Sequence, residues 1–155
     1  MSVAIPKGMI EKLLRWEWIN TYLYRRLERD NPYPKLLEVF DKLVRVQERQ
    51  MEVLEKIAGA TGSEMPKGSA KIRYRSFPDT VKELMDREYQ LLNEYESLNQ
   101  YFLAGTSLIS DAQALVESQT EQVNTLMQLK QTLQSGKKAG HSDMETKPDF
   151  ILEPG

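Results

Sequence analysis

Apolar residues recur at three- and four-residue spacing in four stretches of the chain, as expected for the buried stripe of an amphipathic helix. The four stretches cover residues 10–27, 35–58, 78–102 and 109–133 of the 155-residue sequence. Ser76 and Asp79, on either side of Pro78, are typical of a helix start. The pattern therefore predicts four helices and an all-α fold.

The segments between these stretches predict how the helices are connected. Asn31, Pro32 and Pro34 interrupt the helical pattern after the first stretch, because proline lacks an amide donor and suits the first turn of a new helix. Helices joined by so short a turn are expected to pack antiparallel. Gly59 and Gly62 are natural stops for the second helix, and Gly136 is the expected stop of the fourth.

The predicted architecture is an antiparallel four-helix bundle built from two helical hairpins, at about residues 7–60 and 78–135. The residues between the hairpins contain scattered Gly, Pro, Ser and Lys and form a long crossover between the second and third helices. We expect one bundle domain at residues 1–136. Residues 137–155 are polar and contain Gly140, Pro148 and Pro154, so we expect a flexible C-terminal tail.

The two predicted hairpins also resemble each other in sequence. A shift of 71 residues aligns Glu17 with Glu88 and Tyr24 with Tyr95. Any two amphipathic helices match at leucine positions, but that does not account for shared polar residues within an apolar stripe. A shift of 72 residues aligns further polar pairs in the second and fourth helices, namely Gln47 with Gln119 and Gln50 with Gln122. The matches predict a duplicated hairpin.

Three glutamates are the candidate functional residues. Glu17 and Glu88 lie within the apolar stripes of the first and third helices, where an unpaired ionised carboxylate is expensive to bury. Glu48 lies one turn before Met51 in the second helix, and we expect both to face the same interior. The sequence therefore predicts that three carboxylates converge in the bundle core.

At these positions the chain resembles the ferritin-like superfamily, and in particular its rubrerythrin-type members. In that family two hairpins joined by a long crossover hold a dimetal site, to which two helices each supply a Glu and the other two each supply Glu-x-x-His. Glu17 with Tyr24 and Glu88 with Tyr95 are similar to the family's Glu and Tyr spacing, and Glu48 is similar to the Glu of the second-helix motif. The resemblance covers about residues 7–135.

The chain departs from the family pattern at three metal-ligand positions. Met51 stands where the second-helix motif has His, and Thr120 and Val123 replace the Glu and His of the fourth helix. The single histidine, His141, lies in the predicted tail. Oxygen ligands without histidine suit a hard cation, whereas a redox-active iron pair normally requires imidazoles. The resemblance thus implies a degenerate metal site.

Two interpretations of the glutamates remain open. In the first, the glutamates belong to a buried polar network, in which they pair with Arg or Lys or bond to Tyr24, Tyr95, Gln47 and Gln119. In the second, they hold a metal. The first predicts a non-catalytic ferritin-like binding or structural module without a cofactor. The second predicts a divergent carboxylate-ligated iron or manganese protein with oxidoreductase or metal-storage activity.

The balance of 21 basic and 23 acidic residues, with a net charge of −2, does not favour nucleic acid as a partner. Lys71, Arg73 and Arg75 surround a tyrosine in the crossover and form a possible anion-binding segment. Because the chain as a whole is not basic, a solvated loop that covers the bundle is the preferred interpretation of this segment. A third functional class, an adaptor that binds nucleic acid or an acidic partner through the crossover, remains an alternative.

The remaining predictions concern location and assembly. The absence of cysteine suits the reducing cytoplasm, and neither a signal segment nor a membrane-spanning run is visible. Trp16, Ile19 and Leu23 form a second apolar stripe on the first helix. This face must be buried under the crossover, the tail or a second subunit. We expect a homodimer, and the sequence does not identify another protein partner.

Overall fold

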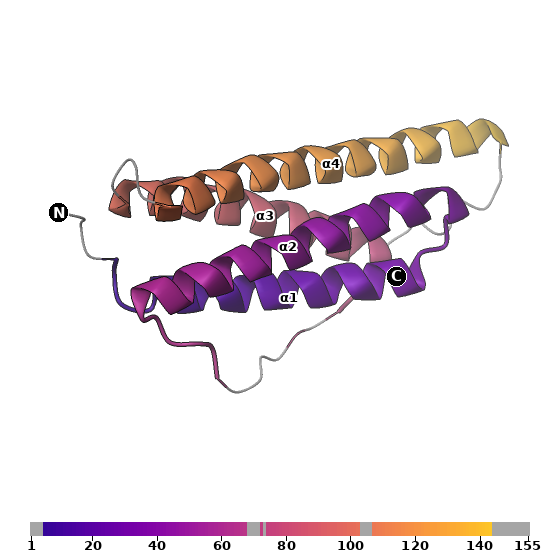
Figure 1. Cartoon of the computed structure of the whole chain (residues 1–155). Coiled ribbons are helices and arrows are strands. Elements are labelled where there is room, and N and C mark those ends of the chain that lie inside the picture. The colour runs from indigo at the N-terminus through magenta and orange to yellow at the C-terminus, as the bar shows by residue number, and fades with distance from the viewer. Residues whose placement is uncertain (1–4, 68–71, 73, 103–106, 144–155) are drawn as a thin grey trace.

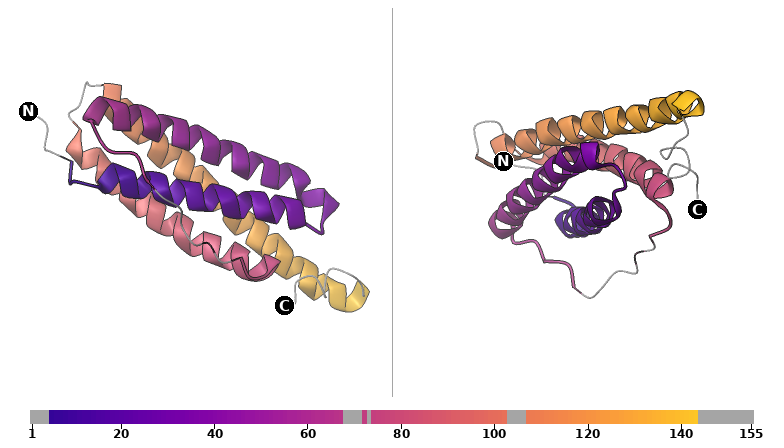
Figure 2. Two further views of the ribbon diagram at one scale, coloured as in Figure 1. Left: turned by 90° about the horizontal axis from the view of Figure 1, so that it is seen from below. Right: turned by 90° about the vertical axis from the view of Figure 1, so that its right-hand side faces the viewer.

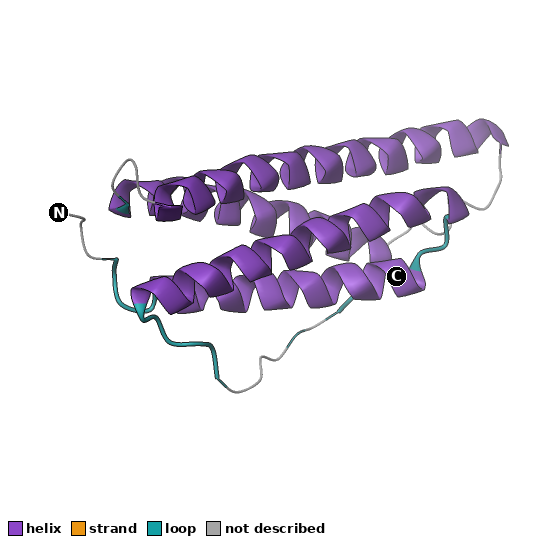
Figure 3. Cartoon of the chain, in the orientation of Figure 1, coloured by secondary structure: helices purple, strands orange, loops and turns teal. Residues whose placement is uncertain are grey.

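The computed structural model describes residues 5–67, 72, 74–102 and 107–143, with side chains described as far as Gln134. In this part of the chain all regular structure is helical, as the apolar spacing predicts (Figures 1 and 3). Four α-helices carry the fold: α1 (Met9–Asp30), α2 (Leu37–Thr61), α3 (Phe77–Leu98) and α4 (Ser107–Asp143). Two short 3-10 helices, η1 (Pro34–Leu36) and η2 (Asn99–Tyr101), precede α2 and follow α3.

Local chemistry explains several of the helix ends. The Asn31 side chain accepts a hydrogen bond from the Tyr33 amide at 2.9 Å and donates one to the Tyr33 carbonyl at 2.7 Å, which closes the turn between α1 and η1. Gly62 follows α2 with a φ of 70°, a left-handed conformation in which glycine is favoured. The Ser76 hydroxyl accepts a hydrogen bond from the Asp79 amide at 3.3 Å and caps α3, as expected.

Of the three glycines expected to end helices, Gly62 follows the end of α2, whereas Gly59 and Gly136 lie within helices. Gly59 lies inside α2, and α4 continues through Gly136 and Gly140 to Asp143, so that His141 lies in this helix rather than in the tail. A glycine within a helix costs only about 1 kcal/mol relative to alanine, so it does not by itself end one. The sequence from Ser107 to Asp143 contains no proline that would stop the helix earlier, and the next proline is Pro148. Residues 144–155 lie outside the described part of the chain.

The backbone of each helix runs close to that of two others. In the described residues, the α1 backbone lies beside α2 and α3, and the α4 backbone lies beside α2 and α3, whereas the diagonal pairs, α1 with α4 and α2 with α3, lie farther apart. The helices therefore form a ring in the order α1, α2, α4, α3 (Figure 2). The described ends of the crossover leave α2 at the left of Figure 1 and enter α3 at the right.

A layer of buried polar side chains separates two apolar clusters inside this ring. One cluster includes Leu27 of α1, Phe40 of α2 and Leu84 of α3. The other includes Leu13 of α1 and Leu54 of α2 at the opposite end of the bundle. The buried polar residues between the clusters are Glu17, Asn20 and Thr21 of α1, Gln47 and Gln50 of α2, Glu88 of α3, and Gln119 and Gln122 of α4.

The second apolar stripe of α1 is largely covered within the chain. Leu23 is fully buried in the first apolar cluster, and Ile19 packs against that cluster. Trp16 packs against the other cluster. Ile72 and Tyr74 of the crossover pack against the first cluster as well, so this part of the crossover covers the bundle. In the described residues we find no helix with the length and apolarity needed to cross a membrane.

Candidate functional site in the buried polar layer

Glu17 and Glu88 are both fully buried, as their positions in the apolar stripes predict. Glu17 accepts hydrogen bonds from the side-chain amide of Gln47 and from the hydroxyl of Tyr95. Gln47 belongs to the same hairpin as Glu17, whereas Tyr95 belongs to the other. The carboxyl group of Glu17 therefore connects the two hairpins.

Glu88 is held by three donors. The Tyr24 hydroxyl donates to its Oε2 at 2.5 Å. The side-chain amides of Asn20 and Gln119 each donate to its Oε1 at 3.0 Å. Gln119 also donates to the backbone carbonyl of Glu88 at 2.8 Å. Tyr24 and Asn20 come from the first hairpin, so Glu88 also connects the hairpins.

The two halves of this network repeat each other with exchanged partners. Tyr24 of the first hairpin donates to Glu88 of the second, and Tyr95 of the second donates to Glu17 of the first. Within each hairpin the matching glutamine, Gln47 or Gln119, donates to its own glutamate. Residues that match in the sequence thus occupy matching positions in the network, which supports the duplication.

Two further glutamines complete the repeated pattern. Gln50 donates to the Oε1 of Gln119 at 2.8 Å, and Gln122 donates to the Oε1 of Gln47 at 3.1 Å. Each of these bonds joins α2 to α4, just as the two tyrosine bonds join α1 to α3. Buried amides are costly unless they are hydrogen-bonded. The layer therefore fixes which helices lie opposite one another and in which register.

The repeat is broken at one place, beside Glu88. Asn20 has Leu91 as its counterpart 71 residues later, and Leu91 has no side-chain donor to offer Glu17. Arg87 donates from its Nε to the Oδ1 of Asn20 at 2.6 Å, which orients the Asn20 amide toward Glu88. The counterpart of Arg87 is Trp16, which is uncharged. Glu88 therefore has one more donor than Glu17, and a cation near it.

Burial determines the protonation of this layer. Burial raises the pKa of Glu17 well above its ordinary value of 4.5, and repulsion from Glu88 raises it further, against the lowering effect of the Tyr95 hydrogen bond. Burial also raises the pKa of Glu88, but hydrogen bonds from Tyr24, Gln119 and Asn20 oppose that rise. The hydrogen bonds therefore favour the ionised form more at Glu88 than at Glu17, so that a proton held between the two carboxyl groups is favoured on Glu17.

The basic and phenolic neighbours fit this assignment. Burial lowers the pKa of the Arg87 guanidinium, while the charges of Glu83 and Glu88 oppose that change. Burial and the nearby carboxyl groups raise the pKa of Tyr24 and of Tyr95 well above 10.0. Both phenols therefore keep their protons and serve as donors.

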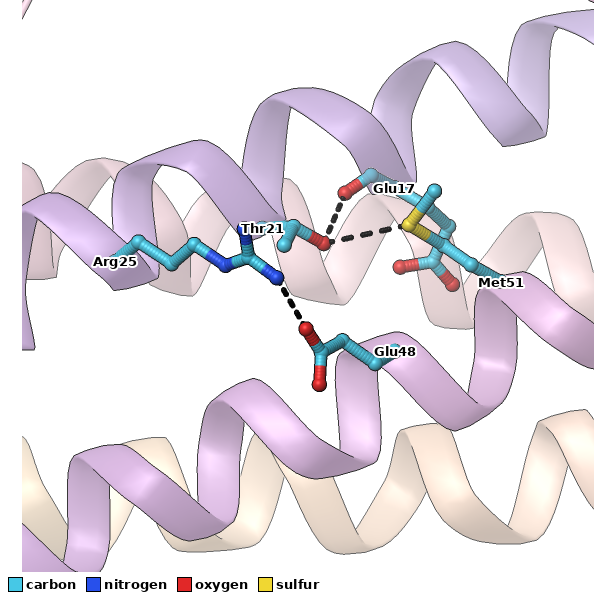
Figure 4. Close-up of polar contacts among 5 residues, drawn as sticks. All are labelled: Glu17, Thr21, Arg25, Glu48 and Met51. Carbon is cyan, nitrogen blue, oxygen red and sulfur yellow. Dashed lines mark hydrogen bonds and ion pairs between the residues drawn. The ribbon is translucent and has the colours of Figure 1, made fainter.

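Glu48 does not join the other two glutamates. It forms an ion pair with Arg25 on the outer side of α1 and α2, and its side chain is 45% exposed. Figure 4 shows its carboxylate directed toward Arg25. The expected convergence of three carboxylates is therefore wrong for Glu48. The interior stripe of α2 runs through Gln47 and Gln50. Glu48 follows Gln47, and successive residues of an α-helix point about 100° apart around its axis, so Glu48 lies outside this stripe.

Three residues stand where the ferritin-like resemblance predicts metal ligands, namely Met51, Thr120 and Val123. Met51 is near the surface, where its sulfur accepts a hydrogen bond from the Thr21 hydroxyl at 3.5 Å (Figure 4). Thr120 is exposed and donates to the Val116 carbonyl at 2.8 Å, and Val123 is buried. In the described part of the chain, no group of three or more His, Cys, Asp or Glu side chains is arranged to hold a metal ion.

The predicted anion-binding segment is only partly described. Arg75 is exposed to solvent, and Lys71 and Arg73 lie outside the described residues. The nearby ring of Tyr74 lies 4.4 Å from the Arg26 guanidinium, a distance at which a cation is attracted to an aromatic face. This contact attaches the end of the crossover to α1.

Sequence reasoning missed Asn20 and Arg87. Asn20 lies three residues after Glu17 and four before Tyr24, on the stripe that is otherwise buried and apolar. A buried amide at that spacing signals a polar partner on a neighbouring helix. Arg87 has no such signal, because a basic residue beside a buried glutamate is common on an exposed helix face.

Comparison with known proteins adds no relative. No family model, no curated protein and no solved structure matches this chain.

Proposed function

We propose that this chain is a ferritin-like, antiparallel bundle of two repeated hairpins that acts as a non-catalytic binding or structural module in the cytoplasm. The observation that carries the proposal is the repeated network, in which protein donors occupy Glu17 and Glu88. In this proposal the hydrogen-bonded carboxyl pair takes the place of a dimetal centre and holds the hairpins together.

The arrangement of the helices supports the ferritin-like part of the proposal. The ring order pairs the helices within each hairpin and pairs α1 with α3 and α2 with α4. The described ends of the crossover lie at opposite ends of the bundle in Figure 1, which supports a bundle in which every neighbouring pair runs antiparallel, as in ferritin-like bundles with one long crossover.

The donor set argues against a resident metal pair. A dimetal centre needs bridging carboxylates and imidazoles from both hairpins. Here Tyr24 and Tyr95 donate hydrogen bonds to the two buried carboxyl groups, and Glu48 is paired with Arg25 outside the core. A carboxyl group that accepts hydrogen bonds from phenols and amides offers fewer free lone pairs to a cation. These residues therefore do not fit the pair of metal ions that the family resemblance implies.

Metal analysis of protein purified without chelator tests the proposal. We expect iron and manganese well below one equivalent by inductively coupled plasma mass spectrometry, and a melting temperature that does not change when EDTA is added. Stoichiometric iron or manganese, together with a melting temperature that falls on chelation, would refute the proposal. That result would favour the alternative, a divergent carboxylate-ligated metal protein with oxidoreductase or metal-storage activity.

A pair of isosteric variants identifies the source of any bound metal. If the buried pair is the ligand set, Glu17→Gln and Glu88→Gln each lower the bound metal, whereas Glu48→Gln does not. Under our proposal all three variants have the same low metal content as the original protein. Glu48→Gln is the matched control because it makes the same chemical change on the outer face of the hairpin.

A further inference from the structure

A groove of about 710 Å³ lies on the outer face of the first hairpin, between α1 and α2. Its lining includes Trp18 and Tyr22, which are 38% and 40% exposed and lie one helical turn apart on α1. No described residue of the crossover lines it. Large, partly exposed aromatic side chains at the middle of a surface are typical of the residues that dominate protein interfaces.

Two contacts across the groove show which residues of α1 and α2 lie at the same height. Thr21 contacts Met51, and Arg25 pairs with Glu48 (Figure 4). Because the two helices run in opposite directions, Trp18 lies toward Glu55. Arg25 lies toward the beginning of α2, and Tyr22 lies between them, at the height of Met51.

Charge changes sign along the groove. Glu52 and Glu55 line the end near Trp18, and three arginines (Arg25, Arg45 and Arg49) line the other end together with Glu48. Arg25 and Arg45 are paired with Glu48 and Asp41. In the part of the chain that the structure describes, Arg49, Glu52 and Glu55 form no ion pair within the chain. One end therefore carries excess positive charge and the other carries excess negative charge.

This gradient suits a second copy of the chain. A two-fold axis turns a surface end for end, so that the basic end of one copy meets the acidic end of the other. An axis that crosses α2 between Arg49 and Glu52 brings Arg49 beside the partner's Glu52, and it turns the end of the groove that contains Arg45 toward the partner's end that contains Glu55. The same axis passes close to Tyr22. An anionic lipid surface or a nucleic acid would instead require a groove of uniformly positive charge.

We propose that the groove between α1 and α2 is the interface of a two-fold symmetric homodimer, with Tyr22 near the axis and Arg49 and Glu52 paired across it. This interface is independent of the proposed function of the buried layer, since none of the layer's glutamates or tyrosines takes part in it.

Charge reversal in sedimentation equilibrium experiments tests the interface. The original protein should sediment at twice its mass of 18.0 kDa at micromolar concentration. Arg49→Glu and Glu52→Arg should each weaken the dimer at least about tenfold, because each places like charges together across the axis. The combined variant should restore dimerisation, because both opposite-charge pairs return. Glu96→Arg, on the exposed surface of α3, should have no effect.

Two outcomes would overturn the proposal. One is a monomer throughout the micromolar range. The other is failure of the double charge reversal to restore the dimer while circular dichroism shows that all variants fold. Cross-linking provides a second readout, because the chain contains no cysteine of its own. Oxidised Tyr22→Cys should form a covalent dimer and Glu96→Cys should not, and equal cross-linking of the two would also refute the interface.

Discussion

The Glu17 half and the Glu88 half of the buried layer are alike in sequence but differ in charge. Each half contains a glutamate, a glutamine from its own hairpin and a tyrosine from the other. Only the Glu88 half contains a further side-chain amide, that of Asn20. Only this half contains a cation, Arg87, which holds the Asn20 amide in place. The comparison shows that two carboxyl groups with matching partners can differ in how strongly the ionised form is stabilised, because Asn20 and Arg87 are present beside only one of them.

The physical reason is the high free energy of two like charges in a buried site. Two ionised carboxylates in the same apolar interior repel each other, and each has lost its hydration. A proton on one of them removes the repulsion, and the extra donor at Glu88 determines which one takes the proton. This role for Asn20 and Arg87 leads to four predictions.

The largest expected effect comes from making the two halves alike. Asn20→Leu copies the residue at the matching position 91 and removes both the donor to Glu88 and the acceptor for Arg87. We expect the free energy of unfolding to fall by about 3 kcal/mol, because hydrogen bonds to charged groups contribute more than neutral ones. Urea denaturation followed by circular dichroism at pH 7 measures the change.

A control variant in the other half isolates the hydrogen bonds from packing. Leu91→Met changes the shape of the matching core position without removing a polar contact, and we expect a loss below about 1.5 kcal/mol. If Asn20→Leu lost no more than Leu91→Met, the Asn20 amide would have no special role, and the comparison between the halves would fail.

The second prediction concerns pH and Glu17. Because the pKa of Glu17 is raised in the folded state, the folded protein keeps a proton that the unfolded chain releases as the pH rises above about 4.5. Stability from this group is therefore greatest at low pH and falls as the pH rises toward the folded-state pKa. The slope is at most about 1.4 kcal/mol per pH unit for one proton.

Glu17→Gln reveals this slope by comparison with the original protein. The variant has no proton to lose at that position, so its stability relative to the original protein should rise between pH 5 and pH 8. Parallel denaturation curves across this range provide the measurement. A difference that stays constant with pH, or that falls as pH rises, would show that Glu17 does not hold the proton.

The sequence predicts the repeated part of this layer better than the part that breaks the repeat. The matches of Glu17 with Glu88 and of Gln47 with Gln119 correspond to matching positions in the structure, as the predicted duplication of the hairpin requires. The exchange of tyrosine partners between hairpins is not visible in the sequence, since spacing within a helix does not show which helix lies opposite.

Glu48 shows the limit of helical spacing for predicting burial. Gln47 and Glu48 are neighbours in the sequence. Either of them fits the three- and four-residue spacing of the buried stripe, depending on where the edge of that stripe is placed. The structure places Gln47 inside and Glu48 outside. A paired carboxylate on the surface costs much less than a third one in the core, and this difference in free energy settles the register of α2.

The third prediction compares the two tyrosines. Tyr24→Phe removes a donor from Glu88, where several hydrogen bonds favour the ionised form, whereas Tyr95→Phe removes one from Glu17, whose pKa is raised well above its ordinary value. We expect losses in the free energy of unfolding of about 2 kcal/mol and about 1 kcal/mol respectively. Both changes remove one buried hydroxyl, so each variant is the control for the other. Thermal melting at pH 7 gives the order, and a larger loss for Tyr95→Phe would reverse our assignment of the charge.

The smallest effect is expected outside the layer, at Glu48. Its ion pair with Arg25 is exposed to solvent, where screening and side-chain entropy leave such pairs worth about 1 kcal/mol at most. Glu48→Gln should therefore change the free energy of unfolding by no more than that amount, measured at a protein concentration where the chain is monomeric. Added salt should leave this small difference smaller still, because exposed charges are screened. A loss as large as that of Asn20→Leu would mean that the outer carboxylate, and not the buried layer alone, holds the first hairpin in register.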